Sequence, residues 1–181
     1  LALCENACIK MGAKIYGATS IGPYSKVGGE LNNVIFQSFS NKGHDGFLGN
    51  SVIGEWCNLG ADTNTSNLKN NYSNVKTYSY IDKTEVQTGI QFMGLFMGDY
   101  SKSGINTMFN TASSIGVCCN VFGSGFPDKH IPSFSWVNSD QITSFDLKKS
   151  ITAANNMMTR RNLKMEQSDL DIFSHLSASK P

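Results

Sequence analysis

The sequence predicts an all-β fold, a parallel β-helix of six-residue repeats that is followed by a helical extension at the C-terminal end. Aliphatic residues recur every six positions over long stretches, and a small residue stands two positions before most of them. An α-helix would space apolar residues three and four apart, and an alternating strand would space them two apart. A period of six instead fits very short strands, with three of them to a coil of roughly eighteen residues.

The repeat assigns a direction to each side chain. Every sixth residue points into the coil, where the coils before and after it bury the side chain, and the small residue two positions earlier fits at a corner. Because the pattern is already present at Leu1, we expect the chain to be a piece of a longer protein. The predicted inward positions are Leu3, Ile9, Ile15, Ile21, Val27, Ile53, Leu59, Met97, Ser103, Phe109, Ile115 and Val121.

The period of six is lost in two stretches, which we interpret as loop excursions from a β-helix domain at 1–137. The first covers about 29–47 and the second about 64–92. Alternation at Val75 and Thr77 in the second stretch predicts a protruding hairpin. Excursions from one face of a solenoid often carry ligand-binding residues.

After Pro132 the pattern changes to helical spacing, and residues 138–181 form the predicted helical extension. Residues 144–158 place apolar side chains three and four apart, which predicts an amphipathic helix with Ser144 as its N-cap. A second helix is predicted at roughly 166–176. We expect the segment before the first helix to cover the unpaired strand edges of the last coil.

Composition and charge exclude several classes of partner. Lysine and arginine total 15 against 14 acidic residues, a net charge of +1 without a long basic run, so neither nucleic acid nor a membrane is an expected partner. No apolar stretch approaches the roughly 20 residues that span a bilayer. Five cysteines without CxxC spacing indicate reduced thiols and a cytoplasmic protein. The histidines at 44, 130 and 175 lack the close spacing of zinc ligands, so no metal is predicted.

The segment KGHDGFLGNSVIGEWCNLGADTNTSN, residues 42–67, carries a specific resemblance. It is similar to the acetyltransferase half of the bifunctional glucosamine-1-phosphate acetyltransferase/N-acetylglucosamine-1-phosphate uridylyltransferase family, in which K-x-G-H-x-x-Y-L-G precedes I-G-x-x-x-N-I/L-G-A-G-T. With GGE, IGEW and MGDYSKSGINTMFNT, the chain resembles more closely the sugar nucleotidyltransferases that carry the same β-helix. The matching positions are His44, Phe47, Leu48, Gly49, Ile53, Gly54, Asn58, Leu59, Gly60, Ala61, Thr63 and Asn67.

The resemblance implies a left-handed β-helix that assembles as a homotrimer with active sites between subunits. It also implies an acetyl-CoA-dependent N-acetyltransferase, an acyltransferase that acetylates an amino-sugar phosphate such as glucosamine 1-phosphate or a related nucleotide sugar. On the same comparison, we expect a nucleotidyltransferase domain to precede Leu1.

The resemblance also implies roles for residues near the motif. His44 would be the general base that takes a proton from the attacking amine, a role that suits an imidazole because its neutral form accepts a proton near neutral pH. Asn67 would orient the amine or the acetyl carbonyl, while Asn58 and Glu30 would bind the sugar substrate. Considered without the resemblance, the same residues fit a surface-loop histidine and two corner amides equally well.

For acetyl-CoA, the resemblance points to two regions of the chain. Gly104, Ile105 and Phe122 would lie beside the pantetheine arm, and their coils would supply backbone amides for the thioester oxygen. Arg160 and Arg161 are candidates to reach a neighbouring subunit and bind the phosphates of CoA there. The two arginines also fit a solvated helix end.

Two departures from the family pattern leave the substrate open. Phe47 stands where the family has a tyrosine, so a hydroxyl that contacts phosphate is missing, and Asn32 stands where a phosphate-binding lysine is expected. Lys42 and Lys69 are the candidates to replace that charge in substrate binding. The alternative hypothesis is therefore a trimerisation or regulatory scaffold of a sugar-1-phosphate nucleotidyltransferase, with the acyl site altered or lost.

Overall fold

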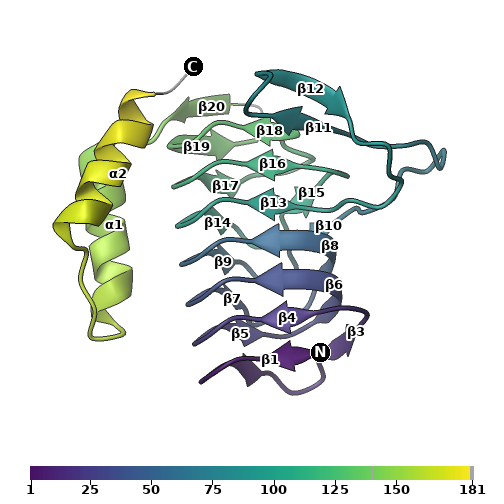
Figure 1. Cartoon of the computed structure of the whole chain (residues 1–181), viewed down its shortest axis with the longest axis horizontal. Helices are drawn as coiled ribbons and strands as arrows, with labels where there is room; N and C mark the ends of the chain where they lie inside the picture. Colours follow the sequence, from purple (N-terminus) through teal and green to yellow (C-terminus); the bar gives the residue numbers. More distant parts are fainter. Residues whose placement is uncertain (140, 180–181) are drawn as a thin grey trace.

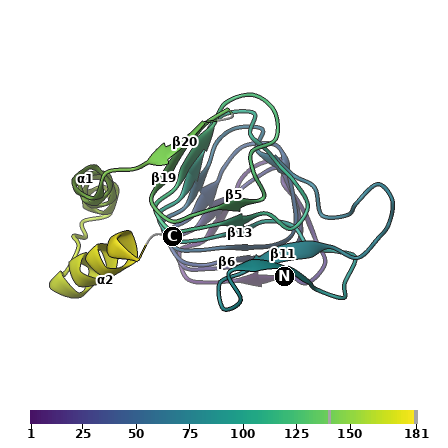
Figure 2. The same cartoon turned by 90° about the horizontal axis from the view of Figure 1, so that it is seen from above.

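The computed structural model describes residues 1–139 and 141–179, and it has the parallel β-solenoid that the period of six predicts. Short strands stack coil upon coil into a tall ladder (Figure 1), and the view from above shows a roughly triangular coil (Figure 2). Strands of successive coils pair in parallel. The left-handed sense of the coil is what the resemblance implies.

Each coil contributes strands to three faces. The first face stacks β1 (Ala2–Leu3), β4 (Ser20–Ile21), β6 (Glu30–Phe36), β8 (Phe47–Ile53), β13 (Phe96–Met97), β16 (Ser114–Ile115) and β18 (His130–Ile131). The second face stacks β2 (Cys8–Ile9), β5 (Lys26–Val27), β7 (Asn41–Lys42), β9 (Asn58–Leu59), β14 (Lys102–Ser103), β17 (Asn120–Phe122) and β19 (Ser135–Asn138). The third face contains β3 (Lys14–Tyr16), the first halves of β6 and β8, and the pair β10 (Asn64–Thr65) and β15 (Met108–Phe109).

The chain turns its corners through residues in the left-handed backbone region. Tyr24, Trp56 and Tyr100 have φ of 58°, 57° and 60°, and each is followed directly by a small buried residue. Such small residues join the coils, because Ser40 Oγ donates a hydrogen bond of 2.6 Å to the carbonyl of Gly54 in the next coil. The same corner conformation occurs at Asn6, Asn33, Phe39, Asn50, Asp62, Asn106, Ala112, Cys118 and Phe134.

The inward positions of the repeat form one continuous core. Ile21, Val27 and Phe109 have no exposed surface, as expected for side chains with a coil on either side. Leu3 and Ile9 are inward positions too, yet they remain 51% and 38% exposed. They belong to the first coil, which has a stacked neighbour on one side only within the described chain.

Residues 29–47, which the lost period predicted as an excursion, stay in the solenoid, and the prediction is corrected here. They form β6, β7 and the start of β8. The period disappears because this coil is shorter: Lys26 pairs with Asn41, fifteen residues later, whereas Cys8 pairs with Lys26, eighteen residues later. A shortened corner shifts the phase of the repeat without taking the chain out of the stack.

The stretch at 64–92 does leave the coil. It contains the predicted hairpin, formed by β11 (Lys76–Ser79) and β12 (Thr84–Gln87) in antiparallel register. The hairpin projects beside the upper coils (Figure 1). It is tied back to them where Thr77 Oγ1 donates to the carbonyl of Ala112 over 3.2 Å.

The extension begins with β20 (Gln141–Ser144), which pairs antiparallel with β19 and covers the edge of that strand. Two helices follow, α1 (Leu147–Thr159) and α2 (Gln167–Ala178), and lie along one side of the solenoid (Figure 1). The predicted cap at Ser144 was wrong: Ser144 ends β20, and the carboxylate of Asp146 accepts the hydrogen bond from the Lys149 amide over 3.0 Å. In the described chain, neither helix has the length and apolarity needed to cross a membrane.

The helices pack on a column of rings at the corner between the first and second faces, which we call the aromatic corner. Phe39 stacks between Tyr24 and Trp56, with ring centroids 5.0 and 4.2 Å away. Trp56 is buried together with Met158 of α1 and Phe173 of α2 in a second apolar cluster. The side chains at these left-handed corners therefore point away from the coil and form the surface on which the two helices pack.

We expect Trp56→Ala to lower the free energy of unfolding by about 3–5 kcal/mol, because the change leaves a cavity between the coil and the helices. Urea unfolding followed by far-ultraviolet circular dichroism measures the loss. Ile81→Ala, at a side chain that is 93% exposed on the hairpin, is the matched control and should change stability by no more than about 0.5 kcal/mol. Equal stability of the two variants would contradict the packing of the helices on the aromatic corner.

Candidate functional site

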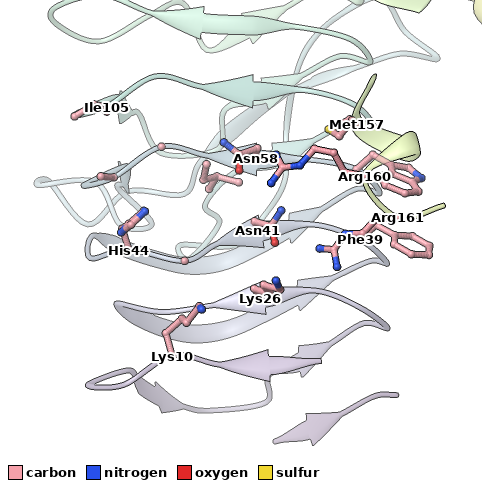
Figure 3. Close-up of a pocket in the computed structure, with 15 residues that line it drawn as sticks. Lys10, Lys26, Phe39, Asn41, His44, Asn58, Ile105, Met157, Arg160 and Arg161 are labelled. Atoms are coloured by element: carbon pink, nitrogen blue, oxygen red, sulfur yellow. The ribbon is translucent and has the colours of Figure 1, made fainter. Parts of the chain in front are cut away.

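The second face presents a row of polar side chains to solvent. Strand residues alternate between the two sides of a sheet, so the residue before each inward position points out of the coil. Lys26, Asn41 and Asn58 occupy this outward position, and they are in register, with Lys26 opposite Asn41 and Asn41 opposite Asn58. Three stacked coils thus place an ammonium and two amides one above another (Figure 3).

A cavity of about 550 Å³ lies over this row. His44 borders it at the corner toward the third face, and the C-terminal end of α1 borders it on the other side (Figure 3). The cavity is lined by Lys10, Lys26, Phe39, Asn41, Gly43, His44, Trp56, Asn58, Leu59, Gly60, Ala61, Ile105, Met157, Arg160 and Arg161. The structure therefore brings together five of the predicted site residues: His44, Asn58, Ile105, Arg160 and Arg161.

The charge of this cavity is positive. Lys10, Lys26, Arg160 and Arg161 line it, and its lining among the described residues includes neither aspartate nor glutamate. The only ion pair between described residues joins Lys129 to Glu85, so none of the four cations is neutralised by a carboxylate. A cavity with four unpaired cations and two amides is suited to an anionic, polyhydroxylated ligand.

His44 stands between this cavity and a second hollow. The second hollow, also of about 550 Å³, includes Asp45 and Asp62 in its lining. The His44 side chain is exposed, and its imidazole makes no hydrogen bond to any residue that the structure describes. An imidazole that is free at both nitrogens, with cations on one side and carboxylates on the other, is available to exchange a proton with a ligand.

Lys42 lies inside the coil beneath His44 and not in the cavity. Its side chain has no exposed surface, and Nζ donates to the backbone carbonyls of His44 and Asp45 over 3.0 and 3.1 Å. Burial lowers the pKa of Lys42 to about 8, opposed in part by the charges of Asp45 and Asp62. The prediction that Lys42 binds substrate is therefore corrected: inward-facing in β7, it instead fixes the loop that carries His44.

Three other predicted residues lie away from the cavity. Glu30 is on the third face, where it accepts a 2.6 Å hydrogen bond from the Tyr16 hydroxyl. Asn67 follows β10 and donates from Nδ2 to Asn50 Oδ1 over 2.7 Å. Lys69 donates to the carbonyl of Asn74 within the excursion. Within one chain these side chains do not meet His44 in the cavity.

Of the residues predicted to lie beside acetyl-CoA, some line the cavity and others lie away from it. Ile105 is 71% exposed at the edge of the cavity. Gly104 lies directly below Phe122, where a Cβ on Gly104 would approach the Phe122 Cβ to 2.7 Å, and its amide donates to the carbonyl of Val121 over 2.8 Å. Phe122 itself packs edge-on against Trp136. The Gly104 amide is therefore engaged in the coil ladder and is not a donor for a thioester oxygen.

Lys10, Lys26 and Asn41 are cavity residues that the sequence analysis missed. The sequence feature that marks Lys26 and Asn41 is their place in the repeat, because each stands directly before an inward residue, as Asn58 does. Finding them requires the coil length, which the sequence alone did not supply between 29 and 47. In the described chain no group of three His, Cys, Asp or Glu side chains is placed to hold a metal ion, and the absence of a metal stays a prediction.

Comparison with known proteins gives relatives of one kind. The bifunctional protein GlmU of Methanocaldococcus jannaschii is 33% identical over 94 residues, which cover 52% of this chain and 22% of that protein. The chain is similar in sequence to GlmU. The GlmU proteins of Methanococcus aeolicus and Trichodesmium erythraeum are 28% and 27% identical, over 66% and 75% of this chain and 25% of each relative. The resemblance expected from the KGHDGFLG segment is thus confirmed, and the chain spans about a quarter of the length of these relatives.

No family model matches the chain. Among solved structures, the polySia specific acetyltransferase NeuO aligns with 79% of this chain and 85% of its own, at 12% identity and a TM-score of 0.32. The UDP-N-acetylglucosamine acyltransferase from Campylobacter jejuni aligns with 96% of this chain and 82% of its own, at 13% identity and a TM-score of 0.28.

We expect the stability of the wild-type protein to rise, relative to Lys42→Met, as the pH increases from about 8 to 10.5. The folded state releases the Lys42 proton near pH 8, and the unfolded chain releases it near the ordinary pKa of 10.5. The unfolded state therefore binds more protons in this window, and the free energy of unfolding increases as the pH rises. Urea midpoints measured across the window test this. Lys164→Met, at an exposed lysine, should keep the wild-type profile, and parallel profiles for Lys42→Met and wild type would contradict the buried charge.

Proposed function

We propose that the chain is an acetyl-CoA-dependent N-acyltransferase domain whose acceptor is a phosphorylated amino sugar, with His44 as general base. The single observation that carries this proposal is the place of His44 between a cationic cavity and a hollow that contains two carboxylates. An amino-sugar phosphate has the complementary groups, because its phosphate suits Lys10, Lys26 and the arginines. Its neutral amino group donates hydrogen bonds, which suits the carboxylates of Asp45 and Asp62.

The proposed reaction needs one proton acceptor. The amine nitrogen attacks the thioester carbon of acetyl-CoA, so that a C–N bond forms and the C–S bond breaks. His44 accepts the proton that the nitrogen loses, and the departing CoA thiolate takes up a proton to become the free thiol. Asn58, two coils above Lys26 in the polar row, donates to or accepts from the sugar hydroxyls.

The similarity to GlmU supports this proposal, and the family that the KGHDGFLG segment resembles implies a homotrimer. Glu30 and Asn67 match the family motif but lie on the third face and beyond it, away from the cavity of their own chain. A site shared between copies of the chain is a way for these side chains to act together with a neighbour's His44. We propose the same trimer in the cytoplasm, where the cysteines, which form no disulfide in the described part of the chain, stay reduced.

The alternative function, a scaffold for a sugar nucleotidyltransferase, is favoured by one group of contacts. Phe47 lacks the hydroxyl of the family tyrosine, and the Gly104 amide is already bonded within the ladder. Asn67 is likewise engaged with Asn50 over 2.7 Å. On this alternative the chain assembles into trimers and binds sugar phosphates without acyl transfer.

We expect His44→Ala to reduce the rate of acetyl transfer by about 10²- to 10⁴-fold, because the attacking amine loses its proton acceptor. Release of CoA thiol from acetyl-CoA is followed with glucosamine 1-phosphate and with UDP-glucosamine as acceptors, using the full chain. His175→Ala removes an exposed histidine of α2 and should retain the wild-type rate.

Thiol release at the background rate for the wild-type protein with both acceptors would contradict acyl transfer and favour the scaffold. If turnover is present and His44→Ala and His175→Ala have equal rates, the acyltransferase proposal stands but His44 is excluded as its general base.

A further inference from the structure

We propose that Lys26, Arg160 and Arg161 form a binding subsite for a diphosphate group, so that the ligand of the cavity is a diphosphate-linked compound and not a monophosphate. The subsite lies between the second face and the end of α1. This inference deepens the proposed function, on which it rests for the role of His44 at the other end of the cavity. It names the class of acceptor as a nucleoside diphosphate amino sugar.

The first support is the state of the cations. The side chains of Lys26, Arg160 and Arg161 make no hydrogen bond and no ion pair with any residue in the described part of the chain. Guanidinium groups bind phosphate oxygens in a bidentate manner, and a diphosphate carries enough oxygens for two of them and an ammonium. A phosphate monoester has three non-bridging oxygens, whereas the diphosphate of a nucleotide sugar has four on two phosphorus atoms, so only the diphosphate offers each guanidinium a separate pair of oxygens.

The second support is the rigidity of the platform that carries the arginines. Ala154 and Met158 of α1 are buried against the aromatic corner, and the Tyr100 hydroxyl lies 3.9 Å from Met158 Sδ. The helix ends immediately afterwards, where the Arg161 amide donates to the carbonyl of Met158 over 2.8 Å. The two arginines therefore leave a fixed helix end, and Figure 3 shows Arg160 reaching from it toward Asn58.

The helix end itself opposes an anion only weakly. A helix C-terminus carries a partial negative charge of about half an elementary charge. Two full positive charges on Arg160 and Arg161, with Lys26 on the facing strand, outweigh it. Lys10 adds a further cation on the side of His44 (Figure 3).

The third support is the short stretch of chain between the polar row and His44. Asn41, which is in register with Lys26, precedes His44 by three residues, so the Cα atoms of Asn41 and His44 lie at most about 10 Å apart. A hexose ring between its amino group and its anomeric phosphate fits within this reach. The extended pantetheine arm, which separates the thioester of CoA from its diphosphate, is longer. Of the two diphosphate sources, the nucleoside diphosphate sugar therefore fits the span from His44 to Lys26.

Isothermal titration with the full chain tests the subsite without requiring turnover. The probes form two pairs: UDP against UMP, which differ by one phosphate, and CoA against 4′-phosphopantetheine, which differ by the diphosphate linkage together with the 3′-phosphoadenosine. We expect UDP to bind about 10- to 100-fold more tightly than UMP, the ratio for added charged hydrogen bonds. The variant R160A/R161A should bind UDP and UMP about equally.

The control K148A/K149A removes two exposed cations from the first turn of the same helix, outside the cavity, and should keep the wild-type preference for UDP. The preference for a diphosphate could instead appear for CoA and not for UDP, and be lost in R160A/R161A. That result would support the subsite but assign it to the cofactor, and it would overturn the nucleotide-sugar acceptor. Equal binding of both members in both pairs, or a preference that R160A/R161A retains, overturns the subsite. Diphosphate binding without any acetyl transfer would count against the proposed reaction alone.

Discussion

A closed triangular coil of very short strands has to turn its backbone sharply at every corner, and residues in the left-handed backbone region make such turns here. For a residue with a side chain this conformation costs roughly 1–2 kcal/mol. The neighbouring coils offset that cost at the stacked corners, because the amides of Phe39, Trp56 and Tyr100 donate to carbonyls of the coil below, as the Trp56 amide does to Ser38 over 3.2 Å. Small buried hydroxyls such as Ser40 Oγ add a second bond between coils. The corners therefore stay aligned along the whole stack.

Aligned corners fix the positions of groups that are far apart in the sequence. Because Phe39 and Trp56 occupy equivalent corners, their rings stack at 4.2 Å with an angle of 3° between them. The column they build is where Met158 and the rest of the C-terminal helices pack. The same alignment puts Lys26, Asn41 and Asn58 into one row on the adjoining face. The candidate site is thus the place where the outward row of the coil meets the end of a helix that the corners hold.

Much of the fold follows from the period of six, which predicts the solenoid, its buried positions and the start of the extension. The failure at 29–47 has a physical origin, because the closure of a coil tolerates fifteen to eighteen residues while the sequence rule assumed eighteen. The cap at Ser144 failed because a strand pairing extends through that residue. His44 and Asn58 were found by resemblance, but placing Lys26 in one row with Asn58 requires the true coil length. Lys42 shows the opposite error, since a lysine in an inward position looks like a solvated charge in the sequence.

The central claim is that one stacked face holds a proton acceptor at one end and a phosphate-binding cluster at the other. A crystal structure of the full chain with UDP-glucosamine tests it most directly. We expect the amino nitrogen within hydrogen-bond distance of the His44 imidazole, and the diphosphate between Lys26 and the side chains of Arg160 and Arg161. A ligand bound away from His44, or with its diphosphate in solvent beyond α1, would contradict the claim.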